Sequence, residues 1–164
     1  SQEKWRAINE IKNEYYRTLF KNNEALAQNA SYPLLAFIQQ QLSSENKITL
    51  LVGHDSNIVA LLAALGVEPY ELNDSLENIP IGGKLLFEVW KHKPSGKLKF
   101  KLDYVYQTTD QLINITPLSL ATPPNQTVLT LKGCEKDEKG FCDYERFQQV
   151  LSESVGNSKL SGSR

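Results

Sequence analysis

The sequence predicts an α/β fold, because strand-like and helix-like patterns alternate around one central junction. At this junction, residues 47–65, the apolar run 48–52 breaks at Gly53 and passes directly into a helical pattern. The preceding 46 residues have the apolar spacing of helices. Residues 85–90 are an apolar run, and residues 98–107 alternate between apolar and polar, as the two strands of a β-hairpin can. At 164 residues, the chain has the length of one ordinary domain.

Residues 1–46 are predicted to form a helical segment. The first helix has an apolar stripe that we expect to pack inward, formed by Trp5, Ile8, Ile11, Tyr15 and Leu19. Asn22 and Asn23 interrupt this helix and can cap a second helix that begins near Glu24. Pro33 lies inside the second helix and must kink or divide it.

Residues 47–155 are predicted to form the α/β part of the chain. Residues 48–52 are rich in β-branched and apolar side chains, as in a buried central strand. The following helix ends at Gly66. His54 and Asp55 lie between the two elements, and open α/β sheets bind ligands outside the carboxyl ends of their strands. If the protein has a chemical activity, we therefore expect it at His54 and Asp55.

The remaining residues predict a loop, a hairpin, a short strand and a last helix. Residues 67–81 lack a sustained period, whereas 85–90 and 98–106 predict an antiparallel hairpin with Lys99, Lys101 and Asp103 on a solvated face. Residues 127–131 predict a short strand. Asp143 can cap a helix with Phe147, Val150 and Leu151 on its inner side. Beyond Ser152 the chain is polar, and residues 156–164 are expected to be a flexible tail.

The charge distribution excludes several classes of partner. The formal net charge is −1 and the basic residues are scattered, so neither a nucleic-acid nor a membrane-surface partner is indicated. No apolar run approaches the roughly 20 residues that cross a bilayer. Small-molecule or protein partners are left.

The two cysteines enclose a short polar loop. Cys134 and Cys142 flank charged residues and a glycine, and two cysteines without a partner histidine argue against zinc. A local disulfide is favoured over two free thiols. Such a disulfide would indicate an oxidising compartment.

The His54–Asp55 pair suits the cleavage of a phosphate monoester. A carboxylic acid can protonate the departing oxygen, and a protonated imidazole can donate hydrogen bonds to phosphoryl oxygens. However, Asp55, Ser56 and Asn57 are also good helix caps. The Gly-His-Asp triplet alone therefore favours a cap over a catalytic acid.

The wider pattern reverses that preference. Val-Gly-His-Asp-Ser-Asn-Ile at 52–58, Ile-Pro-Ile-Gly-Gly-Lys at 79–84 and the Cys134–Cys142 loop together resemble the C-terminal part of histidine acid phosphatases, in branch 2 of the histidine phosphatase superfamily. Within the family, the resemblance is greatest to bacterial periplasmic glucose-1-phosphatases. The related phytases typically have Thr where Ser56 stands.

The resemblance implies part of a three-layer α/β/α fold and a two-step phosphoryl transfer without metal or other cofactor. A histidine in an Arg-His-Gly motif attacks phosphorus, and water then releases phosphate. By this resemblance, Asp55 protonates the leaving oxygen, while His54 and Ser56 bind the substrate. Cys134 and Cys142 match a family disulfide, and the expected location is the periplasm.

The chain departs from the family in lacking the nucleophile motif. Its two histidines are His54 and His92, and neither follows an arginine or precedes the motif's glycine. We expect the chain to be a fragment that is inactive alone, accompanied by its missing N-terminal half, dimerised or rearranged. Three readings stay open: a glucose-1-phosphatase-like enzyme acting on sugar phosphates, a phytase-type enzyme, and an inert binding module that retains the scaffold.

Overall fold

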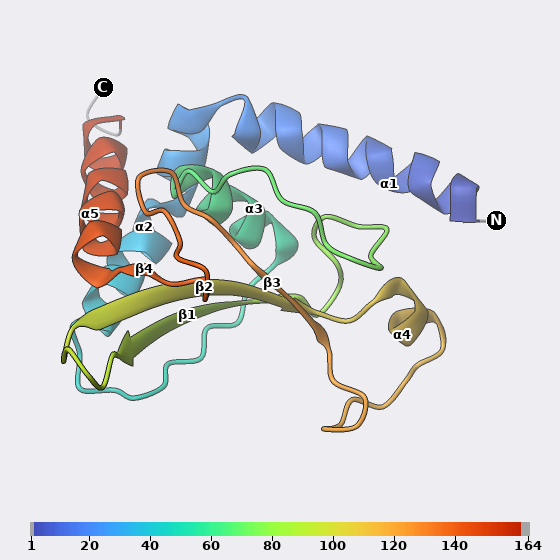
Figure 1. The fold of residues 1–164 in the computed structure, drawn as a ribbon. Helices are drawn as coiled ribbons and strands as arrows, with labels where there is room; N and C mark the ends of the chain where they lie inside the picture. Colours follow the sequence, from blue (N-terminus) through green and yellow to red (C-terminus); the bar gives the residue numbers. More distant parts are fainter. Residues whose placement is uncertain (1, 162–164) are drawn as a thin grey trace.

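The computed structural model describes residues 2–161 and shows a small sheet with helices packed on one of its faces (Figure 1). The predicted α/β class is confirmed. The elements in chain order are α1 (Gln2–Tyr16), η1 (Arg17–Lys21), α2 (Glu24–Leu42), α3 (Asp55–Ala64), β1 (Lys84–Lys91), β2 (Leu98–Tyr106), α4 (Thr109–Ile113), β3 (Asn125–Val128), β4 (Cys142–Asp143) and α5 (Tyr144–Ser161). No helix among these residues combines the length and apolar character needed to cross a membrane.

The sheet is built around β2. Strand β1 pairs antiparallel with it on one side, from Lys84 opposite Val105 to Lys91 opposite Leu98. On the other side, β3 pairs with one half of β2 and the short β4 with the other. The hairpin turn between β1 and β2 closes with the amide of His92 donating to the carbonyl of Lys97, at 2.8 Å. This hairpin was predicted correctly.

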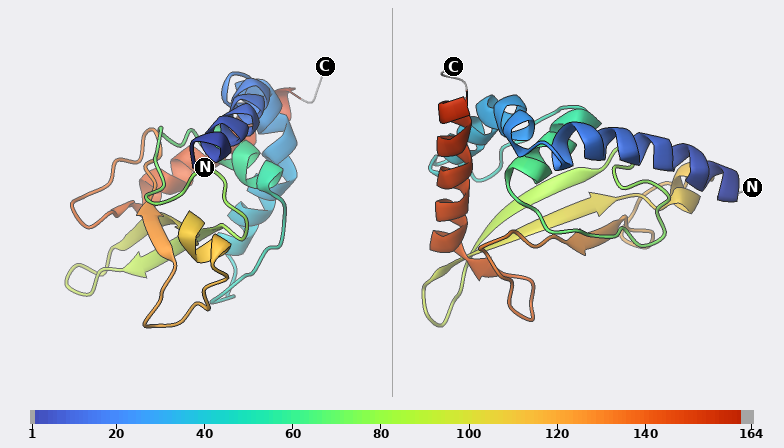
Figure 2. Two further views of the ribbon diagram at one scale, coloured as in Figure 1. Left: turned by 90° about the vertical axis from the view of Figure 1, so that its right-hand side faces the viewer. Right: turned by 90° about the horizontal axis from the view of Figure 1, so that it is seen from above.

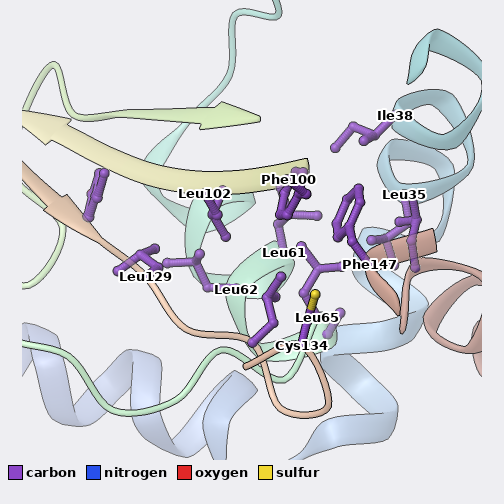
Figure 3. Close-up of a cluster of buried hydrophobic side chains, with 14 of the residues drawn as sticks. Leu35, Ile38, Leu61, Leu62, Leu65, Phe100, Leu102, Leu129, Cys134 and Phe147 are labelled. Carbon is purple, nitrogen blue, oxygen red and sulfur yellow. The ribbon is translucent and has the colours of Figure 1, made fainter. Parts of the chain in front are cut away.

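The core lies between β2 and the helices α2, α3 and α5, as Figure 3 shows. Alternate residues of β2 point into it, namely Phe100, Leu102, Tyr104 and Tyr106, each no more than 1% exposed. The rings of Phe100 and Phe147 stack with centroids 3.4 Å apart, which fixes α5 on the sheet. Leu35 of α2 and Leu61 of α3 complete the packing.

Local capping signals explain where the helices begin and end. The side chain of Asn23 accepts a hydrogen bond from the amide of Leu26, as predicted for the start of α2. Gly66 ends the α3 region with φ +65, a left-handed conformation that favours glycine. Asp143 accepts from the amide of Glu145 at the start of α5. Pro33 does not divide α2, which is continuous around it.

The predicted central strand is not formed. Residues 48–52 are irregular, and Ile48 and Val52 are 89% and 93% exposed. A strand needs a neighbour to receive its hydrogen bonds, and within residues 2–161 the far edge of β1 has no partner strand either. The segment therefore has the composition of a buried strand without the pairing that would make it one.

The first helix also packs differently from the prediction. Four residues of its expected inner stripe, Trp5, Ile8, Ile11 and Tyr15, are exposed. The side of α1 that carries Lys12 and Tyr16 is less exposed and faces the rest of the chain. In Figures 1 and 2, α1 crosses the helical layer and extends beyond it. Polar contacts rather than apolar burial therefore position this helix.

Four smaller differences concern local interactions. Thr108 caps the short helix α4 inside a region expected to be irregular, and β3 begins before residue 127. Helix α5 continues to Ser161 despite its polar composition, while residues 162–164 of the predicted tail lie outside the described residues. Asp103, expected on a solvated face, is fully buried with Lys101 2.8 Å from its Oδ2.

Candidate active site

The predicted site residues lie where α3 begins. His54 has an extended backbone, and its carbonyl accepts hydrogen bonds from the amides of Asn57 and Ile58 at 3.1 and 3.3 Å. The side chain of Asn57 reaches back and accepts from the amide of His54, at 2.8 Å. This reciprocal bonding ends the irregular segment and starts the helix at Asp55.

Asp55 has two different groups of contacts. One carboxylate oxygen, Oδ1, accepts from the amide of Ser56 at 2.8 Å, which satisfies a free donor of the first helical turn. The other, Oδ2, lies 3.3 Å from Nζ of Lys12 on α1. Tyr16, one turn further along α1, hydrogen-bonds to the same carboxyl group. The side chain of Asp55 is 38% exposed and therefore remains open to a ligand.

These contacts favour the ionised form of Asp55. The hydrogen bond from Tyr16 contributes most, followed by the amide of Ser56 and by Lys12, and together they lower the pKa of Asp55 although desolvation raises it. Desolvation and then the bond to Asp55 raise the pKa of Tyr16 to about 12. Tyr16 thus keeps its proton and acts as a hydrogen-bond donor to the carboxylate.

Lys12 also connects Asp55 to the loop that follows α3. Its Nζ is 3.3 Å from Oε2 of Glu77, the same distance as from Asp55. One ammonium group therefore lies between two carboxylates, with partial exposure of all three side chains. Such an arrangement neutralises part of a concentrated negative charge.

Of the tyrosine side chains behind this cluster, Tyr104 is buried and Tyr70 is half-buried. Burial raises the pKa of Tyr70 to about 12 and raises the pKa of Tyr104 further, with the charges of Glu77 and Asp55 contributing to the latter. The hydroxyl of Tyr104 has no hydrogen-bond partner among the described residues. A Cβ atom at Gly83 would come within 2.9 Å of that hydroxyl, so the glycine permits the ring to lie against the loop.

The structure brings three predicted residues together and separates the others. His54 and Ser56 are exposed on either side of Asp55 at the start of α3. His92 lies in the hairpin turn, where its Nδ1 is 2.8 Å from Oγ of Ser95. Cys134 and Cys142 form the predicted disulfide, with 5.6 Å between their Cα atoms. No cluster of three or more His, Cys, Asp or Glu side chains in the described range is arranged to hold a metal ion.

The sequence did not identify Lys12, Tyr16 or Glu77 as part of this cluster. Lys12 and Tyr16 are four residues apart in the sequence, so they share one face of α1. That spacing was visible, but nothing local indicated that this face would meet Asp55. Glu77 lies in a loop without a recognisable pattern, and only the folded chain brings it to Lys12.

A comparison with protein families matches more than half of this chain to a known group. Residues 2–112 match the model of the histidine phosphatase superfamily (branch 2). The glucose-1-phosphatase of Providencia rettgeri is 42% identical over 158 residues, which cover 93% of this chain and 38% of that protein. The glucose-1-phosphatase of Salmonella typhimurium is 40% identical over 152 residues, which cover 90% of this chain and 37% of that protein.

Solved structures give the same grouping. The phytase of Citrobacter braakii superposes with a TM-score of 0.82 at 27% identity, covering 96% of this chain and 43% of that one. The chain thus spans less than two-fifths of the length of the curated relatives it matches.

Proposed function

Because the chain belongs to branch 2 of the histidine phosphatase superfamily, we propose that it supplies the proton donor of an acid phosphomonoesterase. The observation that carries this proposal is the position of Asp55. Its carboxyl group is accessible at the amino terminus of α3, between the exposed residues His54 and Ser56. A helix amino terminus attracts an anionic phosphate.

The proposed reaction has two steps. A histidine from polypeptide outside these residues attacks phosphorus, the bond to the ester oxygen breaks, and the proton of Asp55 passes to that oxygen. Water then attacks the phosphohistidine, the Asp55 carboxylate takes a proton from this water, and phosphate leaves. His54 and Ser56 donate hydrogen bonds to the phosphoryl oxygens.

The contacts of Asp55 require an acidic medium for the first step. A proton donor must carry its proton when the ester bond breaks, and the Tyr16 hydrogen bond lowers the pKa of Asp55. Activity should therefore fall as the pH rises through this pKa. Since disulfides persist in oxidising compartments, the Cys134–Cys142 bond supports a periplasmic location.

We favour sugar phosphates as substrates because the two curated relatives described above are glucose-1-phosphatases. The phytase-type alternative rests on the structural likeness to the Citrobacter braakii enzyme. Hydrolysis rates for glucose 1-phosphate and for an inositol phosphate, measured on the full-length protein, would separate the two.

The first test is the Asp55→Asn variant of the full-length protein. An amide cannot donate this proton, so kcat/KM for glucose 1-phosphate, which reports the steps up to loss of the sugar, should fall about 10²–10⁴-fold. With p-nitrophenyl phosphate the loss should be smaller, because nitrophenolate leaves without protonation. Inorganic phosphate should still bind as a competitive inhibitor.

Asp110→Asn is the matched control, because Asp110 is an exposed aspartate in the first turn of another helix, α4. It should leave kcat/KM unchanged for both substrates. An equal loss of kcat/KM on both substrates in Asp55→Asn, or no loss at all, would remove Asp55 from the role of proton donor.

A second candidate is an inert binding module that retains the scaffold. It is motivated by the histidine count, since neither His54 nor His92 lies in an Arg-His-Gly sequence. An Arg-His-Gly motif in the genomic reading frame upstream of Ser1 would exclude this alternative.

A further inference from the structure

Helix α1 approaches the proposed proton donor with polar rather than apolar side chains. Trp5, Ile8 and Ile11 are exposed, whereas Lys12 and Tyr16 contact Asp55. A helix on the surface of a globular protein normally packs its apolar stripe against the core. This orientation therefore gives the polar side of α1 a role at the start of α3.

Lys12 and Tyr16 both contact the Asp55 carboxyl group. Lys12 Nζ lies 3.3 Å from Asp55 Oδ2, and the Tyr16 side chain hydrogen-bonds to the same residue. Lys12 lies 5.9 Å from the centroid of the Tyr16 ring, so the two side chains lie together. A cation and a hydroxyl donor thus act on the same carboxylate.

Other charged and titratable groups surround this carboxylate. Glu77 from the loop after α3 shares Lys12 with it, at 3.3 Å. Tyr104 of β2 and Tyr70 of the loop after α3 lie behind the cluster. The charge of Asp55 contributes to the raised pKa of Tyr104. His54 precedes Asp55 in the sequence. Lys12 is the cation that balances Asp55 and Glu77 in this group.

We propose that Lys12 and Tyr16 are positioning residues that hold the Asp55 carboxyl group and set the pH at which it gains its proton. This inference rests on the proposed function of Asp55 and extends it to α1. Both partners stabilise the carboxylate more than the neutral acid, since each donates hydrogen bonds and one carries a positive charge. The lowered pKa of Asp55 agrees in direction with this arrangement.

The experiment follows the ¹³C resonance of the Asp55 carboxyl group during an acid titration of the full-length protein. Lys12→Met removes the cation with little loss of volume, and Tyr16→Phe removes only the hydroxyl. Each should move the titration midpoint of Asp55 to higher pH, and Lys12→Arg should restore the original midpoint. Lys4→Met changes the charge of the same helix at an exposed position and should move nothing.

Kinetics provide the second readout. In Lys12→Met and Tyr16→Phe, the alkaline limb of the pH profile of kcat/KM should move to higher pH with the NMR midpoint. Unchanged midpoints in both variants, or a midpoint that moves equally in Lys4→Met, would overturn the inference. A uniform loss of kcat at every pH without a shift of the limb would overturn it too. Loss of activity in Asp55→Asn alongside such results would leave the proposed function standing.

Discussion

Two buried tyrosines on β2 show that a hydroxyl group can stabilise or destabilise the fold, depending on whether it has a hydrogen-bond partner. Tyr104 and Tyr106 point into the same core and are at most 1% exposed. The hydroxyl of Tyr106 donates to the carbonyl of Asn73, at 3.0 Å. The hydroxyl of Tyr104 has no such partner within residues 2–161. A buried polar group without a partner costs desolvation energy that no hydrogen bond offsets.

Replacing each tyrosine by phenylalanine tests this difference. Tyr106→Phe loses the hydrogen bond to the Asn73 carbonyl, which keeps only the Asn125 side-chain amide as a partner, at 3.3 Å. The substitution should therefore lower the free energy of unfolding by about 1 kcal/mol. Tyr104→Phe removes an unpaired hydroxyl and should leave that free energy unchanged or raise it. Urea denaturation of the two variants of this chain measures both values. Equal destabilisation by both substitutions would show that the Tyr104 hydroxyl is paired in solution.

At the same scale, the sequence selected the proposed proton donor, Asp55, but not the residues that contact it. His54, Asp55 and Ser56 are adjacent, so a short motif was enough to select them. Lys12 and Glu77 are remote from Asp55 in the sequence and from each other, and their contacts depend on tertiary packing. A contact of this kind has no local signature in a single sequence.

Among the elements, those with local signals were predicted and those that need a distant partner were not. Asn23, Gly66 and Asp143 mark helix ends through contacts with residues close to them in the sequence. The hairpin pairs neighbouring segments. Residues 48–52, in contrast, carry strand-forming side chains but find no strand beside them.

Helix α4 is a different case, because its signal was present. Thr108 and Gln111 cap each other's backbone amides at 3.0 Å, and this threonine–glutamine spacing is a known start signal. The prolines that follow it and the lack of a regular pattern nevertheless favour an irregular segment.

The disulfide loop stabilises the junction between β4 and α5. Cys134 and Cys142 are both buried, and Cys142 belongs to the strand that leads directly into α5. Closing a loop of this length restricts the unfolded chain, so the Cys134→Ser, Cys142→Ser double variant should lose about 2–3 kcal/mol of unfolding free energy. Denaturation with and without reductant measures it. If reductant destabilises the double variant as much as the parent chain, the disulfide is not the cause.

In the whole molecule, exposed apolar side chains gather at several places among the described residues. They include the segment 48–52, the outer stripe of α1 and residues 113–120, from the end of α4 onward. An uncovered apolar surface beside an unpaired strand edge favours association.

The chain should therefore self-associate as its concentration rises. The double variant Ile48→Lys, Leu50→Lys adds charge to the exposed segment and should shift the chain toward monomer in sedimentation velocity. Lys4→Glu, which changes an exposed charge on α1 outside the apolar stripe, serves as the control and should leave association unchanged. Equal sedimentation of the parent chain and the double variant would show that residues 48–52 do not mediate association.

The hairpin turn between β1 and β2 has a practical consequence. Residues 92–97 are exposed and lie at the end of the hairpin, and the turn is closed by its own backbone and the Ser95 hydroxyl. Exposed tips of this kind tolerate insertion. A fluorophore placed here would label the protein, and a surface-attachment peptide would immobilise it, without occupying the start of α3.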